Sequence, residues 1–84
     1  MKAYNLVGVD GNAFALIGYT IDAMKHAFVC ANRQHDEDGI RCFGHNAQKE
    51  LRDKCMSGSY DNVVCLCYEM CTDVNEYLGL EEEE

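Results

Sequence analysis

The chain has 84 residues and a mass of 9.5 kDa, with 48% apolar and 26% charged residues and a formal net charge of −8. These values fit one small globular domain. They exclude a collagen-like chain, a long coiled coil and a fully disordered chain, and no apolar run approaches the roughly 18 residues of a membrane span. Because the first residues also lack the apolar stretch and cleavage site of a signal peptide, we expect a cytoplasmic protein.

The first predicted element is a β-strand over residues 2–9. Tyr4, Leu6, Val7 and Val9 are apolar and β-prone, and an Asp-Gly turn signal follows them. Since an isolated strand leaves backbone groups unpaired, we expect pairing with a short second strand in the middle of the chain or over residues 74–78, or edge-to-edge dimerisation.

A long helix is predicted over residues 12–31, with Asn12 as its N-cap. The apolar residues recur at spacings of three and four, which is the pattern of one helix face. They are Phe14, Ile17, Ile21, Met24, Phe28 and Ala31. Residues 32–44 break the pattern with a polar run and a turn, so we expect a loop or short strand there.

Two further helices are predicted over residues 46–56 and 60–74, the second with Ser59 as its N-cap. We expect Gly58 to end the earlier helix in a left-handed conformation. The later helix is amphipathic. Its apolar side carries Val63, Leu66, Cys67, Met70, Cys71 and Val74, and its opposite side carries Glu69, Asp73 and Glu76.

Together these elements predict a small α+β fold, with a single domain over residues 1–79 and an acidic disordered tail over residues 80–84. The central contacts should join residues of the long helix to those of the two shorter ones. The predicted core is Phe14, Ile17, Ile21, Met24, Phe28, Leu51, Val63, Leu66, Cys67 and Met70.

The charge is distributed unevenly along the chain. Seven basic residues balance seven acidic residues within positions 1–58, whereas positions 59–84 carry eight acids and no base. This end should repel nucleic acid and anionic membranes and attract a partner with a basic surface. The candidate docking residues are Glu69, Asp73 and Glu76, although the same charges also suit a solvated face that keeps a small protein soluble.

The six cysteines suggest a disulfide framework, a metal site or buried free thiols. In a reducing compartment structural disulfides are rare, and free cysteines often serve as small buried hydrophobic residues. The alternative is a zinc site formed by Cys42, His45, Cys67 and Cys71, although no C-x2-C pair is present. A cysteine enzyme is a third hypothesis, but nothing marks an oxyanion hole or substrate pocket, so we predict no enzymatic activity and no cofactor.

Two segments resemble a group of short uncharacterised proteins encoded by phages and by bacteria that carry prophages. Residues 10–18 (DGNAFALIG) are similar to the group's D-G-N-A-F-A opening, and residues 57–64 (SGSYDNVV) to its S-G-D-Y-D-H-L-L segment. The resemblance implies an origin and no reaction. Asn62 stands where the group has histidine, and the cysteines are not part of its pattern.

Both segments lie at junctions between predicted elements, so folding alone can demand their sequence. Alternatively, Asn12, Tyr60 and Asp61 meet on one surface and form a binding site. The prediction from the whole sequence is a non-enzymatic protein-interaction module of a bacterial host or phage, with a homodimer as a further option and a small zinc module as the alternative function.

Overall fold

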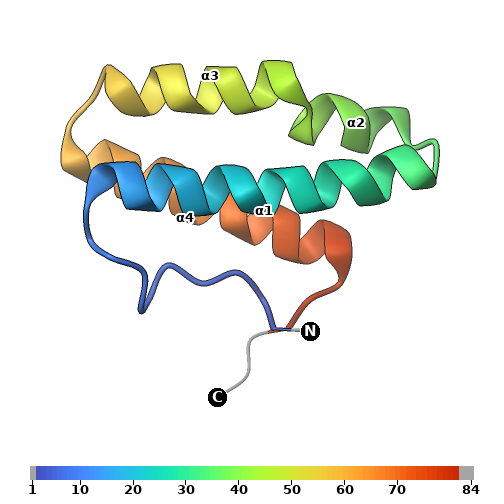
Figure 1. Ribbon diagram of the computed structural model, residues 1–84, viewed down its shortest axis with the longest axis horizontal. Helices are drawn as coiled ribbons and strands as arrows, with labels where there is room; N and C mark the ends of the chain where they lie inside the picture. The colour runs from blue at the N-terminus through green and yellow to red at the C-terminus, as the bar shows by residue number, and fades with distance from the viewer. Residues whose placement is uncertain (1, 82–84) are drawn as a thin grey trace.

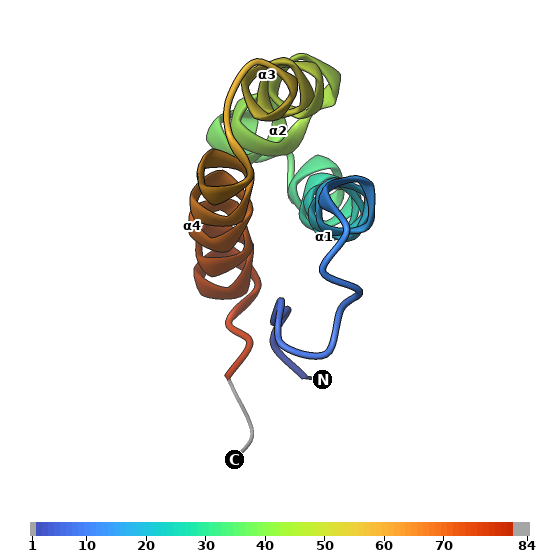
Figure 2. The same ribbon diagram turned by 90° about the vertical axis from the view of Figure 1, so that its left-hand side faces the viewer.

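The computed structural model describes residues 2–81, and within them the chain forms four α-helices and no β-strand. The helices are α1 (Ala13–Arg33), α2 (Glu37–Phe43), α3 (His45–Met56) and α4 (Tyr60–Leu78). In Figure 1, α2 and α3 follow one another along one side of α1, while α4 crosses α1. Seen along α1 in Figure 2, α1, α4 and the α2–α3 pair lie at the corners of a triangle. The predicted α+β fold is therefore wrong, and the described part of the domain is all-helical.

The predicted strand over residues 2–9 is an irregular segment, because no second strand meets it in the described residues. An asparagine side chain on α4 replaces a strand partner. The Tyr4 amide donates to Asn75 Oδ1 at 2.7 Å, and Asn75 Nδ2 donates to the Tyr4 carbonyl at 2.9 Å. The strand-like contact in the described residues is one isolated parallel bridge between Lys2 and Glu81. The edge-to-edge dimer predicted from this segment therefore lacks the strand edge on which it was based.

The helix predicted over residues 12–31 is confirmed as α1. Asn12 caps it, because its Oδ1 accepts a hydrogen bond from the Phe14 amide at 2.8 Å. The core contains buried apolar side chains from all four helices. They are Leu16, Ile17, Ile21, Ala23, Met24, Ala27, Phe43, Leu51, Cys55, Val63, Cys67 and Val74. Of the predicted core, Phe28, Leu66 and Met70 are only partly buried, and Phe14 is 70% exposed because it points to one side of the buried face of α1, whereas its neighbour Ala13 packs against the core.

Residues 32–44 contain the unpredicted helix α2. Asp36 is its N-cap and accepts a hydrogen bond from the Gly39 amide at 3.3 Å, and two more acids occupy the first turn. A capping aspartate followed by acids favours a helix start, and this signal was present in the sequence. Gly39 allows α2 to pack closely, since a Cβ there would lie 2.7 Å from the Cβ of Ala31 on α1.

The two later helices are confirmed, with α4 four residues longer than predicted. Gly79 ends α4 in a left-handed conformation with φ 69°, whereas the same conformation predicted for Gly58 is wrong. Along α4, Val63 and Cys67 are buried while the three acidic side chains predicted to face solvent are exposed. Residues 82–84 of the predicted tail lie outside the described residues.

None of the helices within residues 2–81 combines the length and apolar composition needed to cross a membrane.

Candidate functional site

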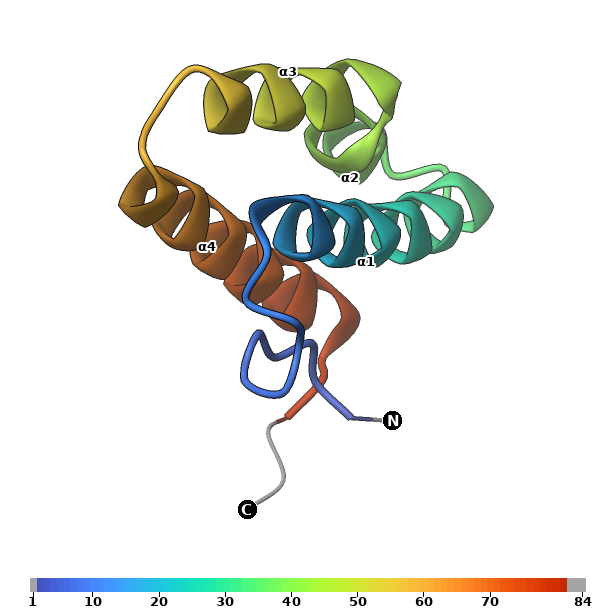
Figure 3. The same cartoon turned by 60° about the vertical axis from the view of Figure 1, so that its left-hand side comes forward.

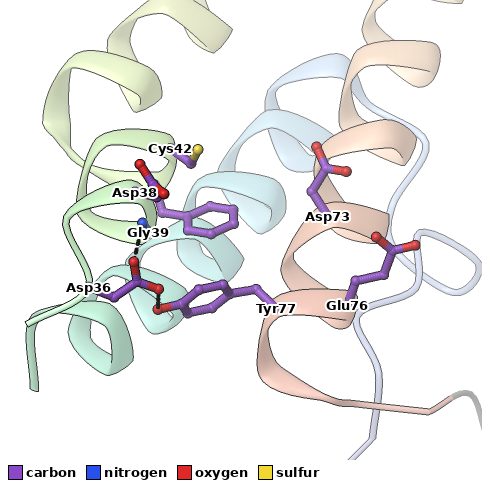
Figure 4. Close-up of a pocket in the computed structure, with 8 residues that line it drawn as sticks. Asp36, Asp38, Gly39, Cys42, Asp73, Glu76 and Tyr77 are labelled. Atoms are coloured by element: carbon purple, nitrogen blue, oxygen red, sulfur yellow. Dashed lines mark hydrogen bonds between the residues drawn. The ribbon is translucent and has the colours of Figure 1, made fainter. Parts of the chain in front are cut away.

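A cleft of about 360 Å³ lies between α2 and α4 (Figure 4). Among the described residues that line it, four side chains are carboxylates and none is basic. The lining residues are Asp36, Asp38, Gly39, Cys42, Phe43, Asp73, Glu76 and Tyr77. Figure 3 shows that α4 runs obliquely to the α2–α3 pair. The cleft therefore combines an acidic lining with aromatic and thiol groups.

Tyr77 spans the cleft from α4 to the start of α2. Its hydroxyl donates to Asp36 Oδ2 at 2.7 Å, and its ring packs against buried Phe43 with 5.2 Å between ring centroids and 56° between planes. Figure 4 shows the side chain reaching across to Asp36. One hydrogen bond and one aromatic contact thus hold the two walls together.

The same hydrogen bond fixes the protonation of both partners. The Tyr77 hydroxyl lowers the pKa of Asp36 below its ordinary value, and the hydrogen bond from the Gly39 amide lowers it further. In return, the hydrogen bond to the Asp36 carboxylate raises the pKa of Tyr77 to about 12. At neutral pH the cleft therefore holds a charged aspartate beside a neutral phenol.

Replacing Tyr77 with phenylalanine should lower the free energy of unfolding in a pH-dependent manner. In the folded protein the pKa of Asp36 is below its ordinary value of 3.8. The stabilisation from the hydrogen bond is therefore complete above pH 3.8, and it is lost as the pH falls through the pKa of the folded protein. The pKa of Tyr77 is raised from its ordinary value of 10.0 to about 12. The stabilisation is therefore complete below pH 10.0 and is lost as the pH rises through about 12. The difference in stability between wild type and variant should be largest on the plateau between these limits.

Denaturant unfolding of both proteins at a series of pH values measures this difference. Tyr68→Phe, at a 64% exposed position of the same helix, is the control and should leave stability unchanged. A difference for Tyr77→Phe that stays constant from strong acid to strong alkali would contradict the assignment.

The acids on the α4 side of the cleft are not neutralised within the described residues. Asp73 and Glu76 are exposed and take part in no ion pair there. On the opposite side, Asp38 pairs with Arg41, but both side chains are at least three-quarters exposed. Exposed pairs contribute little, so the carboxylates around the cleft are accessible to an outside cation.

A second hollow of about 240 Å³ lies between α3 and α4 and shares Asp73 with the cleft. Its apolar residues include Leu51, Leu66 and Met70, and Glu69 also lines it. Glu50 there pairs with Lys54 at 2.8 Å. The three acids predicted as docking residues, Glu69, Asp73 and Glu76, therefore border two adjoining hollows.

The sequence did not identify Asp36, Asp38, Phe43 or Tyr77 as parts of this site. The acidic cap at Asp36 was the available signal for α2, and Tyr77 was missed because α4 was expected to end at residue 74. No periodic pattern within one helix indicates which side chain of another helix lies opposite it.

The alternative binding site, Asn12, Tyr60 and Asp61, lies at the starts of α1 and α4, and the structure brings these two helix starts into contact. The Tyr60 hydroxyl on α4 donates a hydrogen bond to the Gly11 carbonyl, which directly precedes the cap residue Asn12. The segments 10–18 and 57–64 therefore touch. Asn12 is occupied as a cap and Tyr60 links the helix starts, while Asp61 is exposed in the first turn of α4, so these contacts have a structural role.

The four residues of the predicted zinc site are not brought together. Cys42 is exposed on α2, whereas Cys67 and Cys71 are buried on α4. His45 is exposed at the start of α3, where its ring lies 5.9 Å from that of Phe28. Among residues 2–81 no three His, Cys, Asp or Glu side chains are grouped in a way that could hold a metal ion.

The buried thiols belong to the core instead. Burial raises the pKa of Cys55 to about 11, with a further contribution from Cys67, and burial also raises the pKa of Cys71. Such thiols are neutral at physiological pH and are poor nucleophiles. The interpretation of Cys55, Cys67 and Cys71 as small buried hydrophobic residues agrees with this environment.

Comparison of the chain with protein-family models, curated proteins and solved structures finds no match. The resemblance to phage-encoded proteins therefore stays a prediction.

Proposed function

We propose that this protein is a non-enzymatic interaction module that binds a basic surface of a protein partner through the acidic side of α4 and the cleft beside it. The observation that carries the proposal is a cleft of about 360 Å³ lined by four carboxylates and no base, with aromatic side chains between them. Surfaces of this kind attract and orient partners of opposite charge.

The charge distribution supports the same partner class. The exposed acids Glu69, Asp73 and Glu76 lie on one helix without a compensating base in its sequence. They would repel nucleic acid and anionic lipid, so we propose neither as a direct ligand. A nucleic-acid-binding protein of a bacterial host or phage, with its basic surface, is a partner that fits this charge.

Burial of free thiols favours the cytoplasm as the place of action. Cys55, Cys67 and Cys71 are buried as thiols, which suits a reducing compartment. We therefore propose a cytoplasmic role in a bacterial host.

The test compares two triple variants with the same change in net charge. Glu69→Gln/Asp73→Asn/Glu76→Gln removes the acids of α4, whereas Asp22→Asn/Glu37→Gln/Asp53→Asn removes exposed acids that do not line the cleft. Each protein is immobilised and exposed to bacterial lysate, and the captured proteins are identified by mass spectrometry. The captured partner is then purified for measurement of its dissociation constant at low and high salt.

We expect a basic partner that binds wild type and the control variant alike, binds the α4 variant about tenfold or more weakly, and loses affinity as salt rises. The proposal is wrong if the control variant loses as much affinity as the α4 variant. It is also wrong if the captured proteins that depend on the α4 acids are not basic.

A further inference from the structure

The cleft is small and opens widely to solvent. Its volume of about 360 Å³ is at the lower end of the range for small-molecule pockets. Its accessible aromatic surface is the half-buried Tyr77 ring, which packs against Phe43, and Phe43 itself is only 4% exposed. One long side chain with an apolar stem therefore fits better than a large cofactor.

The electrostatics of the lining select a cation. The Asp36 carboxylate already accepts hydrogen bonds from the Tyr77 hydroxyl and the Gly39 amide. It therefore adds negative charge to the cleft while these two bonds fix its orientation. Asp73 and Glu76 have no ion-pair partner among the described residues. They are three residues apart on α4, a spacing that makes side chains neighbours on a helix surface. Two neighbouring acceptors thus border an aromatic wall.

We propose that the cleft between α2 and α4 binds an arginine side chain of the partner protein, with the guanidinium paired to Asp73 and Glu76 and the stem packed against the ring of Tyr77. This assignment rests on the proposed function and names the group that the acidic surface recognises. The cleft is then the specific part of an interface whose remaining acids act at longer range.

Arginine fits this combination better than lysine for geometric reasons. Its planar guanidinium presents several donors to carboxylates and also stacks on aromatic rings. A lysine ammonium is more strongly hydrated and loses more on leaving water. Because the cleft offers carboxylates and an aromatic wall together, it should distinguish the two cations and not merely attract positive charge.

The test is an NMR titration of the full chain with three small probes. They are N-acetyl-arginine amide, N-acetyl-lysine amide and the uncharged N-acetyl-citrulline amide. We expect saturable shifts with the arginine probe at the amides of Gly39, Phe43, Asp73 and Tyr77, which belong to the cleft. The lysine probe should bind about tenfold more weakly, which corresponds to about 1.4 kcal/mol, and the citrulline probe should not saturate.

Two double variants test the location of binding. Asp73→Asn/Glu76→Gln should abolish the saturable shifts, whereas Asp22→Asn/Asp53→Asn, outside the cleft and equal in charge change, should leave them intact. Equal affinity for arginine and lysine overturns the assignment. The assignment is also overturned if no shifts saturate, if the shifts spread over the acids outside the cleft, or if both variants lose binding equally.

The arginine titration and the partner-capture experiment can fail independently of one another. If partner capture depends on the acids of α4 but the cleft does not prefer arginine, only the arginine assignment fails. If the cleft binds arginine but no basic partner depends on these acids, the proposed function fails and the assignment to a protein partner fails with it.

Discussion

Replacing Met24 with alanine is expected to lower the free energy of unfolding by about 2–5 kcal/mol. Met24 has no exposed surface and is the largest of the fully buried side chains within the described residues. Its removal leaves a cavity in the hydrophobic core. Domains of this size are stabilised by roughly 0.05–0.15 kcal/mol per residue, so the loss is a large share of the total.

Urea unfolding followed by circular dichroism measures the effect as a fall in the midpoint at an unchanged slope. Met24→Leu keeps most of the volume and should cost less than about 1.5 kcal/mol, which keeps the comparison interpretable if the alanine variant does not fold. A loss from Met24→Ala no greater than that from Met24→Leu would contradict the packing described.

Phe14→Ala is the matched control on the same helix and the same predicted face. The apolar spacing placed Phe14 and Met24 together in the core, but Phe14 is 70% exposed. Its truncation should therefore change stability by no more than about 0.5 kcal/mol, as expected for a surface substitution. A large loss at Phe14 would restore the sequence-based core and contradict the structure.

This contrast shows what the sequence could and could not predict. Periodicity located α1, α3 and α4, the caps Asn12 and Ser59 marked the starts of α1 and α4, and the separation of buried thiols from exposed acids on α4 followed from spacing alone. A helical pattern identifies the face of a helix that is apolar, but not how far around the helix the neighbouring helices cover that face. Phe14 was misplaced for that reason.

The error over residues 2–9 has a different cause. A run of apolar, β-prone residues suits any extended segment that packs on a core, and a strand needs a partner as well. Here Tyr4, Leu6 and Val9 pack against the core while Val7 is 86% exposed. The side chain of Asn75, which lies 71 residues away from Tyr4 along the chain, supplies the hydrogen bonds that a neighbouring strand would have given.

The candidate cleft was half predictable. The acids of α4 were identified from charge and helical spacing, because both are local properties. The opposite wall depends on the close packing of α2 against α1 and on the contact of Tyr77 with Asp36, 41 residues away. Such long-range contacts are set by tertiary packing and not by local pattern.

Gly39→Ala tests this packing directly and is expected to destabilise the fold by about 1–3 kcal/mol, the cost of overpacking. An added Cβ would lie 2.6 Å from the Tyr77 hydroxyl oxygen and 2.7 Å from the Cβ of Ala31. A Cβ on a helix cannot rotate away, so α2 must separate from α1 or Tyr77 must leave its place. Either movement weakens the hydrogen bond to Asp36 and changes the cleft.

Gly18→Ala is the control for the helix propensity of alanine. Gly18 lies within α1, and nothing stands within 4 Å of a Cβ added there. This change should stabilise the protein by roughly 0.5–1 kcal/mol, because alanine favours helix over glycine by that amount. Denaturant unfolding should thus give opposite signs for the same substitution in two helices. If Gly39→Ala stabilises the chain as Gly18→Ala does, α2 is not packed against α1 and Tyr77 as described, and the wall of the cleft opposite α4 is lost with it.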